Sequence, residues 1–491
     1  DEQVRRQKEA FVRGLSGGTA AELLLLALCV PASLWLRCAI GSCVDRRQRS
    51  AAVKEQAPLP LGSFLLDLLI VAVPCVLSFT VLADSLSTLL AANVGLAAAL
   101  VLRLLSSYAD TTTLRKWRAP VAVGGERPRY LSVYRGCVLL TTCIGILAVD
   151  FRSFPRRFAK TEAFGVSLMD MGVGSFVVTN ALLGSQRQPP SSAAARVPYV
   201  EHLVKSVRGI CPLLLLGIAR VAAVKGVNYQ EHASEYGVHW NFFFSLAAVA
   251  LATSVCKPAN DAPLLFGGLL LLVHEFLLTL LGVGEWALQE SPDGNRRGES
   301  LLEQNREGIV SIPGYWALHL LSTALARFLR IGRWSQHSRA KWRGIEQSAF
   351  VTGVGGSLVA VCLWVAWILM ASGLRIVPMQ TSRRLCNTAY VVLVLAFNMT
   401  VLSPIALLHA FSWASPAALE DSGCFSMLYA LHYNALASFL TANLVTGAVN
   451  LLTDTLAASS ELSVLILISY AAIFTAPYYY LLKFNCRLKC W

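Results

Sequence analysis

Apolar runs of membrane-spanning length recur along the whole chain, and they restrict its fold more than any other feature. Nearly every run is long enough for a helix to cross about 30 Å of hydrocarbon at about 1.5 Å per residue, and the short run 209–224 is compatible with a partial span. A membrane β-barrel would instead show shorter segments of alternating polarity. We therefore predict an all-α, polytopic membrane protein with about 13 transmembrane helices in a single bundle, over residues 21–41, 62–82, 84–105, 131–149, 164–184, 209–224, 237–256, 262–283, 308–329, 349–371, 386–412, 427–452 and 461–483.

The polar connections between these runs are too short to fold as separate domains. We expect one multispan membrane domain over residues 1–491, of which residues 1–20 form a short polar N-terminal segment. The connection 185–204 holds Pro189, Pro190 and a Ser/Ala run, a composition typical of a flexible loop.

Charge is scarce but biased toward lysine and arginine. Hydrophobic residues make up 55% of the chain and charged residues 14%, with a formal net charge of +13. No soluble domain is available to bind nucleic acid, and cationic loops commonly orient membrane proteins. Alternate loops carry about 20 and about 15 Lys and Arg, a modest bias. This bias predicts a cytoplasmic C-terminus and a lumenal or extracellular N-terminus, with loop 150–163 facing away from the cytosol.

Several enzyme classes lack their motifs in this sequence. It contains no phosphate-binding GxxxxGK[ST], no HxxxxD acyltransferase motif and no GxSxG elbow. The 13 cysteines are scattered without CxxC or zinc spacing. We expect no metal site and no permanently bound cofactor.

The loop 150–163 concentrates chemistry at the end of an apolar run. Asp150 ends the run, Lys160 follows ten residues later, and Pro155 between them interrupts any helix, so the loop can fold back. A carboxylate could then act as general base while an ammonium stabilises developing negative charge. Guanidinium groups suit phosphate, and three are present: Arg152, Arg156 and Arg157. The alternative is a cationic interfacial anchor.

A second carboxylate, Asp170, is expected about two turns into the next span. Carboxylates inside membranes are costly and tend to be functional. The alternative is a buried carboxyl that fixes helix packing, which Gly172 and Gly174 would assist by allowing close approach.

The segment EYGVHWNFFF places polar groups at the expected start of a span. Glu235 and His239 are four residues apart and would share a helix face, which could relay protons, and Asn241 follows. An interfacial aromatic belt is the favoured alternative.

The segment NREGIVSIPGYW offers Asn305, Arg306 and Glu307 immediately before a span. Pro313 and Gly314 then predict a break or kink. Interrupted helices often line cavities in membrane proteins, although an ordinary proline kink would give the same pattern.

Other polar residues lie inside apolar runs. Such side chains more often bond neighbouring helices than substrates. They are His274, Glu275, Arg220, Asn434, Asn443 and Asn450.

Five stretches resemble the PIG-W family of glycosylphosphatidylinositol-anchor inositol acyltransferases, in family order across about residues 132–452. They are YRGCVLLTTCIGILAVDFRSFPRRFAKTEAFGVSLMDMGVGSFVVTNAL, EYGVHWNFFF, NREGIVSIPGYWAL, SRRLCNTAYV and FLTANLVTGAVNL. The resemblance implies a multi-pass endoplasmic reticulum protein. It would transfer a fatty acyl chain from acyl-CoA, typically palmitoyl-CoA, to the inositol 2-hydroxyl of glucosaminyl-phosphatidylinositol.

The same resemblance assigns residues. The family's Asp and Lys pair maps onto Asp150 and Lys160, the expected catalytic residues. The expected partners are both substrates and membrane lipids. Other matched polar residues are pocket candidates: Arg152, Arg156, Arg157, Glu162, Asp170, Asn180, Glu235, His239, Asn241, Asn305, Glu307 and Asn443. A lumenal Asp150 would lie opposite the cytosolic supply of acyl-CoA, a tension that the sequence leaves open.

Two alternatives remain, and the first belongs to a different class of protein. A transporter or flippase of a lipid or small solute would use Asp170, Glu275 and Arg220 along a path through the membrane. An acyltransferase with an unrelated acceptor would depend on an intramembrane histidine, for which His274 is the candidate.

Overall fold

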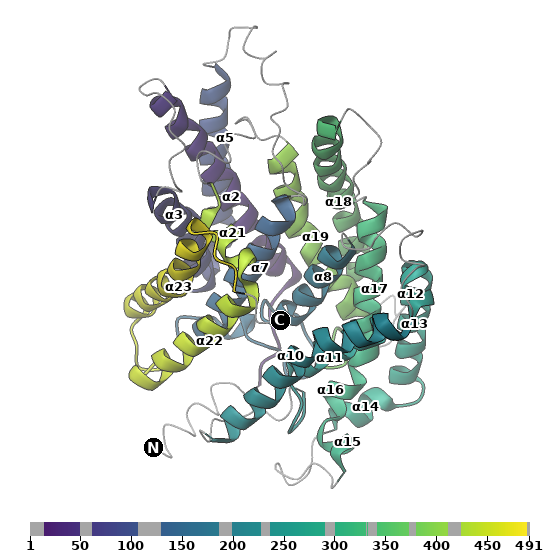
Figure 1. Ribbon diagram of the computed structural model, residues 1–491. Helices are drawn as coiled ribbons and strands as arrows, with labels where there is room; N and C mark the ends of the chain where they lie inside the picture. The colour runs from purple at the N-terminus through teal and green to yellow at the C-terminus, as the bar shows by residue number, and fades with distance from the viewer. Residues whose placement is uncertain are drawn as a thin grey trace.

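The computed structural model describes residues 14–49, 61–106, 129–185, 199–226, 236–289, 300–329, 331, 341–372, 380–410 and 424–488. Figure 1 shows its helices gathered into one bundle. In chain order they are α2 (Ala20–Arg49), α3 (Leu61–Asp67), η1 (Leu68–Ala72), α4 (Val73–Phe79), η2 (Ala83–Ser85), α5 (Leu86–Ser106), α7 (Arg129–Ala148), η3 (Arg156–Phe158), α8 (Met171–Ser185), α10 (Tyr199–Gly226), α11 (Phe242–Val255), α12 (Lys257–Asp261), α13 (Pro263–Thr279), α14 (Val283–Leu288), α15 (Leu301–Gln304), α16 (Arg306–Val310), α17 (Ile312–Phe328), α18 (Lys341–Ala371), α19 (Thr388–Ala410), α21 (Ser426–Tyr433), α22 (Ala435–Leu452) and α23 (Ser460–Lys483).

Three helices form the inside of the bundle. α2, α7 and α19 are buried along most of their length, and α19 packs against α2, α7, α8, α17 and α18. By contrast, α5, α18 and α22 bury little of their surface, and leucines such as Leu444 and Leu452 point outward. A helix that is apolar all round suits this arrangement, because its outer face can meet lipid.

The described residues hold nine helices long and apolar enough to cross a membrane, and three shorter apolar helices, α8, α11 and α13. An all-α, polytopic membrane protein is confirmed, and the count of 13 spans stays a prediction.

Three predicted spans differ from the structure. The span expected from 164 begins only at Met171, because residues 160–170 form a loop. The span expected over 427–452 is divided at Asn434, where the backbone leaves the helical conformation. The short span expected from 209 is part of α10, which begins at Tyr199. That helix takes up the end of the predicted flexible loop 185–204, of which 186–198 lie outside the described residues.

Several connections meet at one end of the bundle. We call this region the loop junction: residues 14–19, 149–170, 236–241, 305–311 and 380–387. Backbone hydrogen bonds join its parts. Gly18 donates to the Val166 carbonyl at 2.8 Å, Gly165 to the Thr381 carbonyl at 2.9 Å, and Gly308 to the Tyr236 carbonyl at 2.9 Å. The loop junction therefore brings together four of the five stretches that resemble the PIG-W family.

Candidate active site

The Asp150 loop, residues 149–170, folds back on itself directly after α7. Pro155 has an extended ψ of 130° and is followed by the short turn η3. The side chains of Phe151, Phe154 and Phe158 are buried, and the Met169 amide donates to the Phe158 carbonyl at 3.1 Å. The reversal predicted at Pro155 is present, and the three buried rings fix it against the bundle.

Asp150 lies two residues past the end of α7 and is half-buried. Its Oδ2 accepts a hydrogen bond of 2.8 Å from Nδ2 of Asn450 on α22. Lys160 is also half-buried, ten residues further along the same loop. One loop therefore presents a carboxylate and an ammonium at the same end of the bundle, and their joint action on one substrate stays a prediction.

Arg156 holds the turn. Its Nη2 donates to the carbonyls of Val149 at 2.8 Å and Phe154 at 3.1 Å, and its Nε also donates to the Phe154 carbonyl at 3.3 Å. Burial lowers the pKa of Arg156 to about 10, and the negative charge of Asp150 opposes that shift. These bonds favour a structural role, because they turn the guanidinium toward the protein's own backbone.

The two remaining loop arginines differ from Arg156 and from each other. Arg157 pairs with Glu22 of α2 at 2.7 Å and with Asp84 of η2. It therefore ties the Asp150 loop to two other parts of the chain. Arg152 is exposed. Of these three arginines, Arg152 is best placed to meet a phosphate from outside.

Asp170 is a loop residue, which corrects its predicted place two turns into a span. It precedes the first residue of α8 and is buried. Its Oδ1 pairs with Nε of Arg383 at 2.9 Å, and its Oδ2 accepts from the Thr161 hydroxyl at 2.9 Å. The hydroxyl of Tyr390 donates to its backbone carbonyl at 2.7 Å. This arrangement supports the alternative of a carboxyl that fixes packing.

Arg384 makes a second buried pair beside the first. Its Nη2 contacts Oε1 of Glu307 at 2.7 Å, and its Nη1 donates to the Glu162 carbonyl at 2.8 Å. The exposed side chain of Glu162 accepts from the Gly14 amide at 2.6 Å. Glu162 and Glu307, both pocket candidates, thus join the Asp150 loop to the N-terminal segment and to α16.

The predicted Glu235–His239 pair on one helix face is wrong, because residues 236–241 are not helical. Glu235 itself lies outside the described residues. The His239 amide donates to Oδ1 of Asn305 at 2.8 Å. Asn241 caps α11, accepting from the Phe243 amide at 3.0 Å. Asn241 and Asn305 therefore hold the backbone that leads into α11.

The break predicted near Pro313 is present. Ser311 separates α16 from α17, and Pro313 occupies the first turn of α17, where its missing amide costs nothing. Glu307 lies inside α16 rather than before a helix. Arg306 and Glu307 are thus carried by a short helix that lies within the loop junction.

Two pocket candidates lie elsewhere. Asn180 on α8 and Asn443 on α22 are exposed, and Nδ2 of Asn443 donates to the Phe439 carbonyl of its own helix at 2.7 Å. On α13, His274 contacts the Leu385 carbonyl, just before α19, at 3.0 Å, and Glu275 accepts from the amide of Thr388, the first residue of α19, at 2.9 Å. The expectation that His274 and Glu275 bond neighbouring elements is confirmed.

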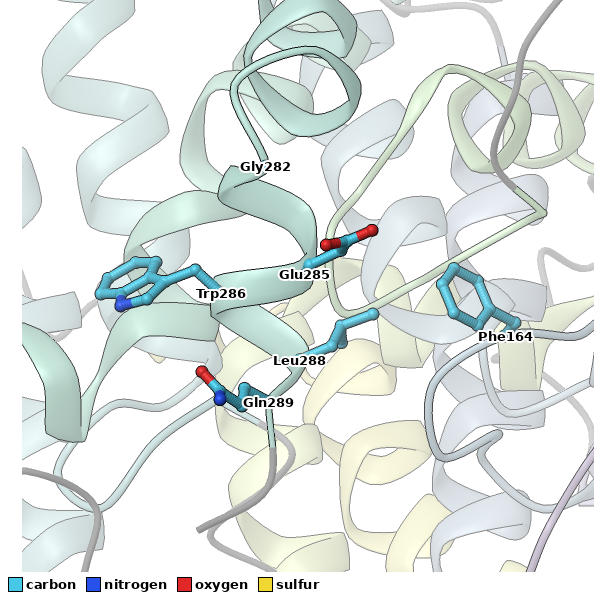
Figure 2. A pocket seen from close by; sticks show the side chains of 6 residues that line it. All are labelled: Phe164, Gly282, Glu285, Trp286, Leu288 and Gln289. Atoms are coloured by element: carbon cyan, nitrogen blue, oxygen red, sulfur yellow. The ribbon is translucent and has the colours of Figure 1, made fainter.

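A hollow of about 540 Å³ adjoins Phe164 of the Asp150 loop. Figure 2 shows Phe164 on one side, with Glu285 and Leu288 of α14 opposite and Trp286 turned away. Gly282 and Gln289 complete the lining. Among the residues that the structure describes, this lining holds one carboxylate, Glu285, and no basic side chain. These lining residues alone do not favour a phosphate or coenzyme A.

Sequence reasoning missed Arg383, Arg384 and Asn450 as site residues. The first two stand in the matched stretch SRRLCNTAYV, directly before α19, and each pairs with a carboxylate from a distant part of the chain. Adjacent arginines at the edge of an apolar run are the signal that could have indicated them. Nothing local identifies the partner of Asn450.

Comparison with known proteins gives matches that cover all the stretches gathered at the loop junction. The GWT1 family profile matches residues 4–481. The chain belongs to the GWT1 family. It is 33% identical to the GPI-anchored wall transfer protein 1 of Eremothecium gossypii, with 99% of this chain and 98% of that protein covered. It is 36% identical to an uncharacterized protein of Arabidopsis thaliana, with 87% and 88% covered.

A further relative carries the name that the sequence predicts. The phosphatidylinositol-glycan biosynthesis class W protein of Dictyostelium discoideum is 28% identical over the full length of both chains. The predicted resemblance to the PIG-W family is confirmed. The profile match also extends beyond the resembling stretches at about 132–452, to Val4 at one end and Leu481 at the other.

Proposed function

We propose that this protein is an inositol acyltransferase of glycosylphosphatidylinositol-anchor biosynthesis. In this proposal it transfers a fatty acyl chain, typically palmitoyl, from acyl-CoA to the 2-hydroxyl of inositol in glucosaminyl-phosphatidylinositol. Membership of the GWT1 family supports the pathway. The observation that carries the chemistry is that Asp150 and Lys160 are half-buried in the same folded-back loop, and that Asn450 of α22 donates a hydrogen bond to Asp150.

The reaction needs a base and a group that stabilises an oxyanion, and no metal or permanently bound cofactor is proposed. Asp150 accepts the proton of the 2-hydroxyl as that oxygen attacks the thioester carbonyl. The ammonium of Lys160 stabilises the negative charge of the tetrahedral intermediate. The carbon–sulfur bond then breaks, and the proton held by Asp150 passes to the departing thiolate. The products are the ester and coenzyme A.

The rest of the loop would keep these two groups in place. Arg156 binds the loop's own carbonyls, and Arg157 fixes the loop to α2 and η2. The exposed Arg152 is the proposed ligand of the lipid phosphate. Residues that position a reacting group matter because small displacements cost much of the rate.

Location follows from the same proposal. A multi-pass membrane protein acting on a lipid intermediate of this pathway belongs in the endoplasmic reticulum membrane. Charge bias supports a lumenal N-terminus and a cytoplasmic C-terminus. Acyl-CoA would then reach Asp150 from within the bundle, because the loop junction faces the lumen in this orientation.

Of the four residues named for the two alternatives, three make structural contacts, and the fourth, Arg220, is exposed on α10. Asp170 pairs with Arg383, and Glu275 accepts from the Thr388 amide. His274 is buried against the Leu385 carbonyl. A transport path or a histidine-centred acyltransferase site would need these groups to face a substrate.

The decisive experiment replaces each catalytic candidate by a residue of similar size. Asp150→Asn removes the base and Lys160→Met removes the charge. We expect each variant, purified in lipid nanodiscs, to lose at least about 100-fold in acyl transfer from palmitoyl-CoA to glucosaminyl-phosphatidylinositol. General acid–base catalysis contributes about 10²- to 10⁴-fold, and loss of one group that stabilises an oxyanion costs about 10²- to 10³-fold. The product is measured by mass spectrometry, with no ion gradient present.

Asp454→Asn is the matched control. Asp454 lies just past the end of α22, and its Oδ1 accepts from the amides of Leu456 and Ala457, as an asparagine oxygen also can. This variant should keep wild-type turnover. Full activity of Asp150→Asn or of Lys160→Met would refute the role given to that residue.

A further inference from the structure

Asn450 makes an unusual contact for a residue on an outer helix. It lies two residues before the end of α22, next to Leu451 and Leu452, which expose most of their surface. A polar side chain on such a helix needs a partner, because lipid offers none. Its amide donates to Oδ2 of Asp150, 300 positions away in the sequence, at 2.8 Å.

We propose that Asn450 is a positioning residue for Asp150, orienting the carboxylate toward the inositol hydroxyl and stabilising its ionised form. The inference rests on the proposed function, in which Asp150 is the general base. It adds α22 to the catalytic machinery, a helix that contributes no charged side chain of its own.

An amide suits this task chemically. It donates a hydrogen bond without a charge that could neutralise the base, and it cannot take up the proton that Asp150 must accept. Hydrogen bonds to ionised groups are stronger than those between neutral groups, and a bond to the charged form favours that form. The bond therefore keeps Asp150 ionised and fixes its rotation at the same time.

The same loop and the segments that follow Asn450 in the chain carry other charged groups. Arg156 interacts electrostatically with Asp150, and Lys160 lies in the same loop. Asp454 bonds the amides after α22, and Glu461 of α23 contacts the Ser459 hydroxyl at 3.4 Å. All four remain in place when Asn450 alone is changed, so a change in pH dependence can be assigned to Asn450.

The test measures the pH–rate profile of two variants in lipid nanodiscs with palmitoyl-CoA and glucosaminyl-phosphatidylinositol. Asn450→Leu removes the donor, and Asn450→Asp keeps the shape but adds a like charge. Without the donor, Asp150 is protonated more easily. As the pH is lowered, the variant therefore loses activity at a higher pH than the wild type does. We expect the acid midpoint of kcat to rise by about one pH unit in Asn450→Leu, and further in Asn450→Asp. KM for palmitoyl-CoA should stay near its wild-type value.

Asn93→Leu is the matched control, because Asn93 on α5 donates across a helix pair to a neutral acceptor, the Ser33 hydroxyl, at 3.2 Å. Its acid midpoint should equal that of the wild type. If both Asn450 variants lower kcat equally at every pH, or only lower the melting temperature, Asn450 is merely structural and the inference is overturned. A fully active Asp150→Asn would overturn the proposed function itself, and that result needs no change at Asn450.

Discussion

At the scale of single residues, the loop junction uses charge mainly to join distant segments. Asp170 and Glu307 are both buried, and each is neutralised by one of two consecutive arginines, Arg383 and Arg384. A buried carboxylate left alone would be costly, whereas a paired and hydrogen-bonded one is tolerated. The pairs therefore fix the Asp150 loop and α16 to the segment before α19.

The Asp170–Arg383 pair gives a stability prediction. Arg383→Met leaves the Asp170 carboxylate buried without its countercharge. Asp170→Asn leaves the Arg383 guanidinium buried without a carboxylate partner. Each single variant should lose about 3 to 5 kcal/mol of stability. The double variant should lose less than the two single losses combined, because neither charge remains.

Apparent melting temperatures of the purified protein in one detergent measure this coupling. Asp84→Asn, which changes an exposed partner of Arg157, is the control and should shift the melting temperature little. Strictly additive losses in the double variant would show that the two side chains do not stabilise each other.

At the scale of elements, glycine decides how closely α8 approaches α19. A Cβ built on Gly174 would lie 2.7 Å from both γ carbons of Val394 and 3.1 Å from the hydroxyl of Tyr390. The approach predicted from Gly172 and Gly174 is therefore confirmed for Gly174. At Gly172 a Cβ would meet no atom within 4 Å. Two glycines two residues apart thus have different roles in one helix.

This difference predicts opposite results for the same substitution. Gly174→Ala should destabilise by about 1 to 3 kcal/mol, because the β-branched Val394 cannot easily move aside. Gly172→Ala should be neutral or should stabilise by up to about 1 kcal/mol, since alanine favours the helix. Thermal unfolding of the two variants side by side checks the prediction. Equal destabilisation would mean that α8 and α19 are not in close contact at Gly174.

At the scale of the whole molecule, hydropathy predicted the membrane architecture but not the ends of its elements. The stretch before Asp170 is apolar enough to be predicted as part of a span. The carboxylate of Asp170 nevertheless bonds Thr161 and Arg383, and these bonds hold the stretch as a loop. The division at Asn434 also lies inside one continuous apolar run. The composition of a segment indicates whether it can lie in a membrane. The residues at which its helices begin and end depend instead on contacts between distant segments.

The same reason explains which site residues could be predicted. The sequence indicates Asp150 and Lys160 as candidates, because a carboxylate and a cationic loop follow the end of an apolar run. The partners that hold the loop, Asn450 and Arg383 among them, lie more than 200 positions away. A single sequence carries no information on such pairings.

The N-terminal segment tests whether the loop junction works as one unit. Gly17 forms a parallel bridge with Val166 at a φ of +84°, and a Cβ there would clash with the Val166 carbonyl oxygen. Gly14 also has a positive φ, +74°, but a Cβ there would meet no atom within 4 Å. Alanine would therefore strain the backbone at both positions and displace the Asp150 loop at only one. Gly17→Ala should lower kcat for acyl transfer at least about tenfold, since misplaced catalytic groups cost rate steeply, while Gly14→Ala should stay within about twofold. If both variants lose activity equally, backbone strain alone accounts for the loss, and the N-terminal segment does not position the Asp150 loop.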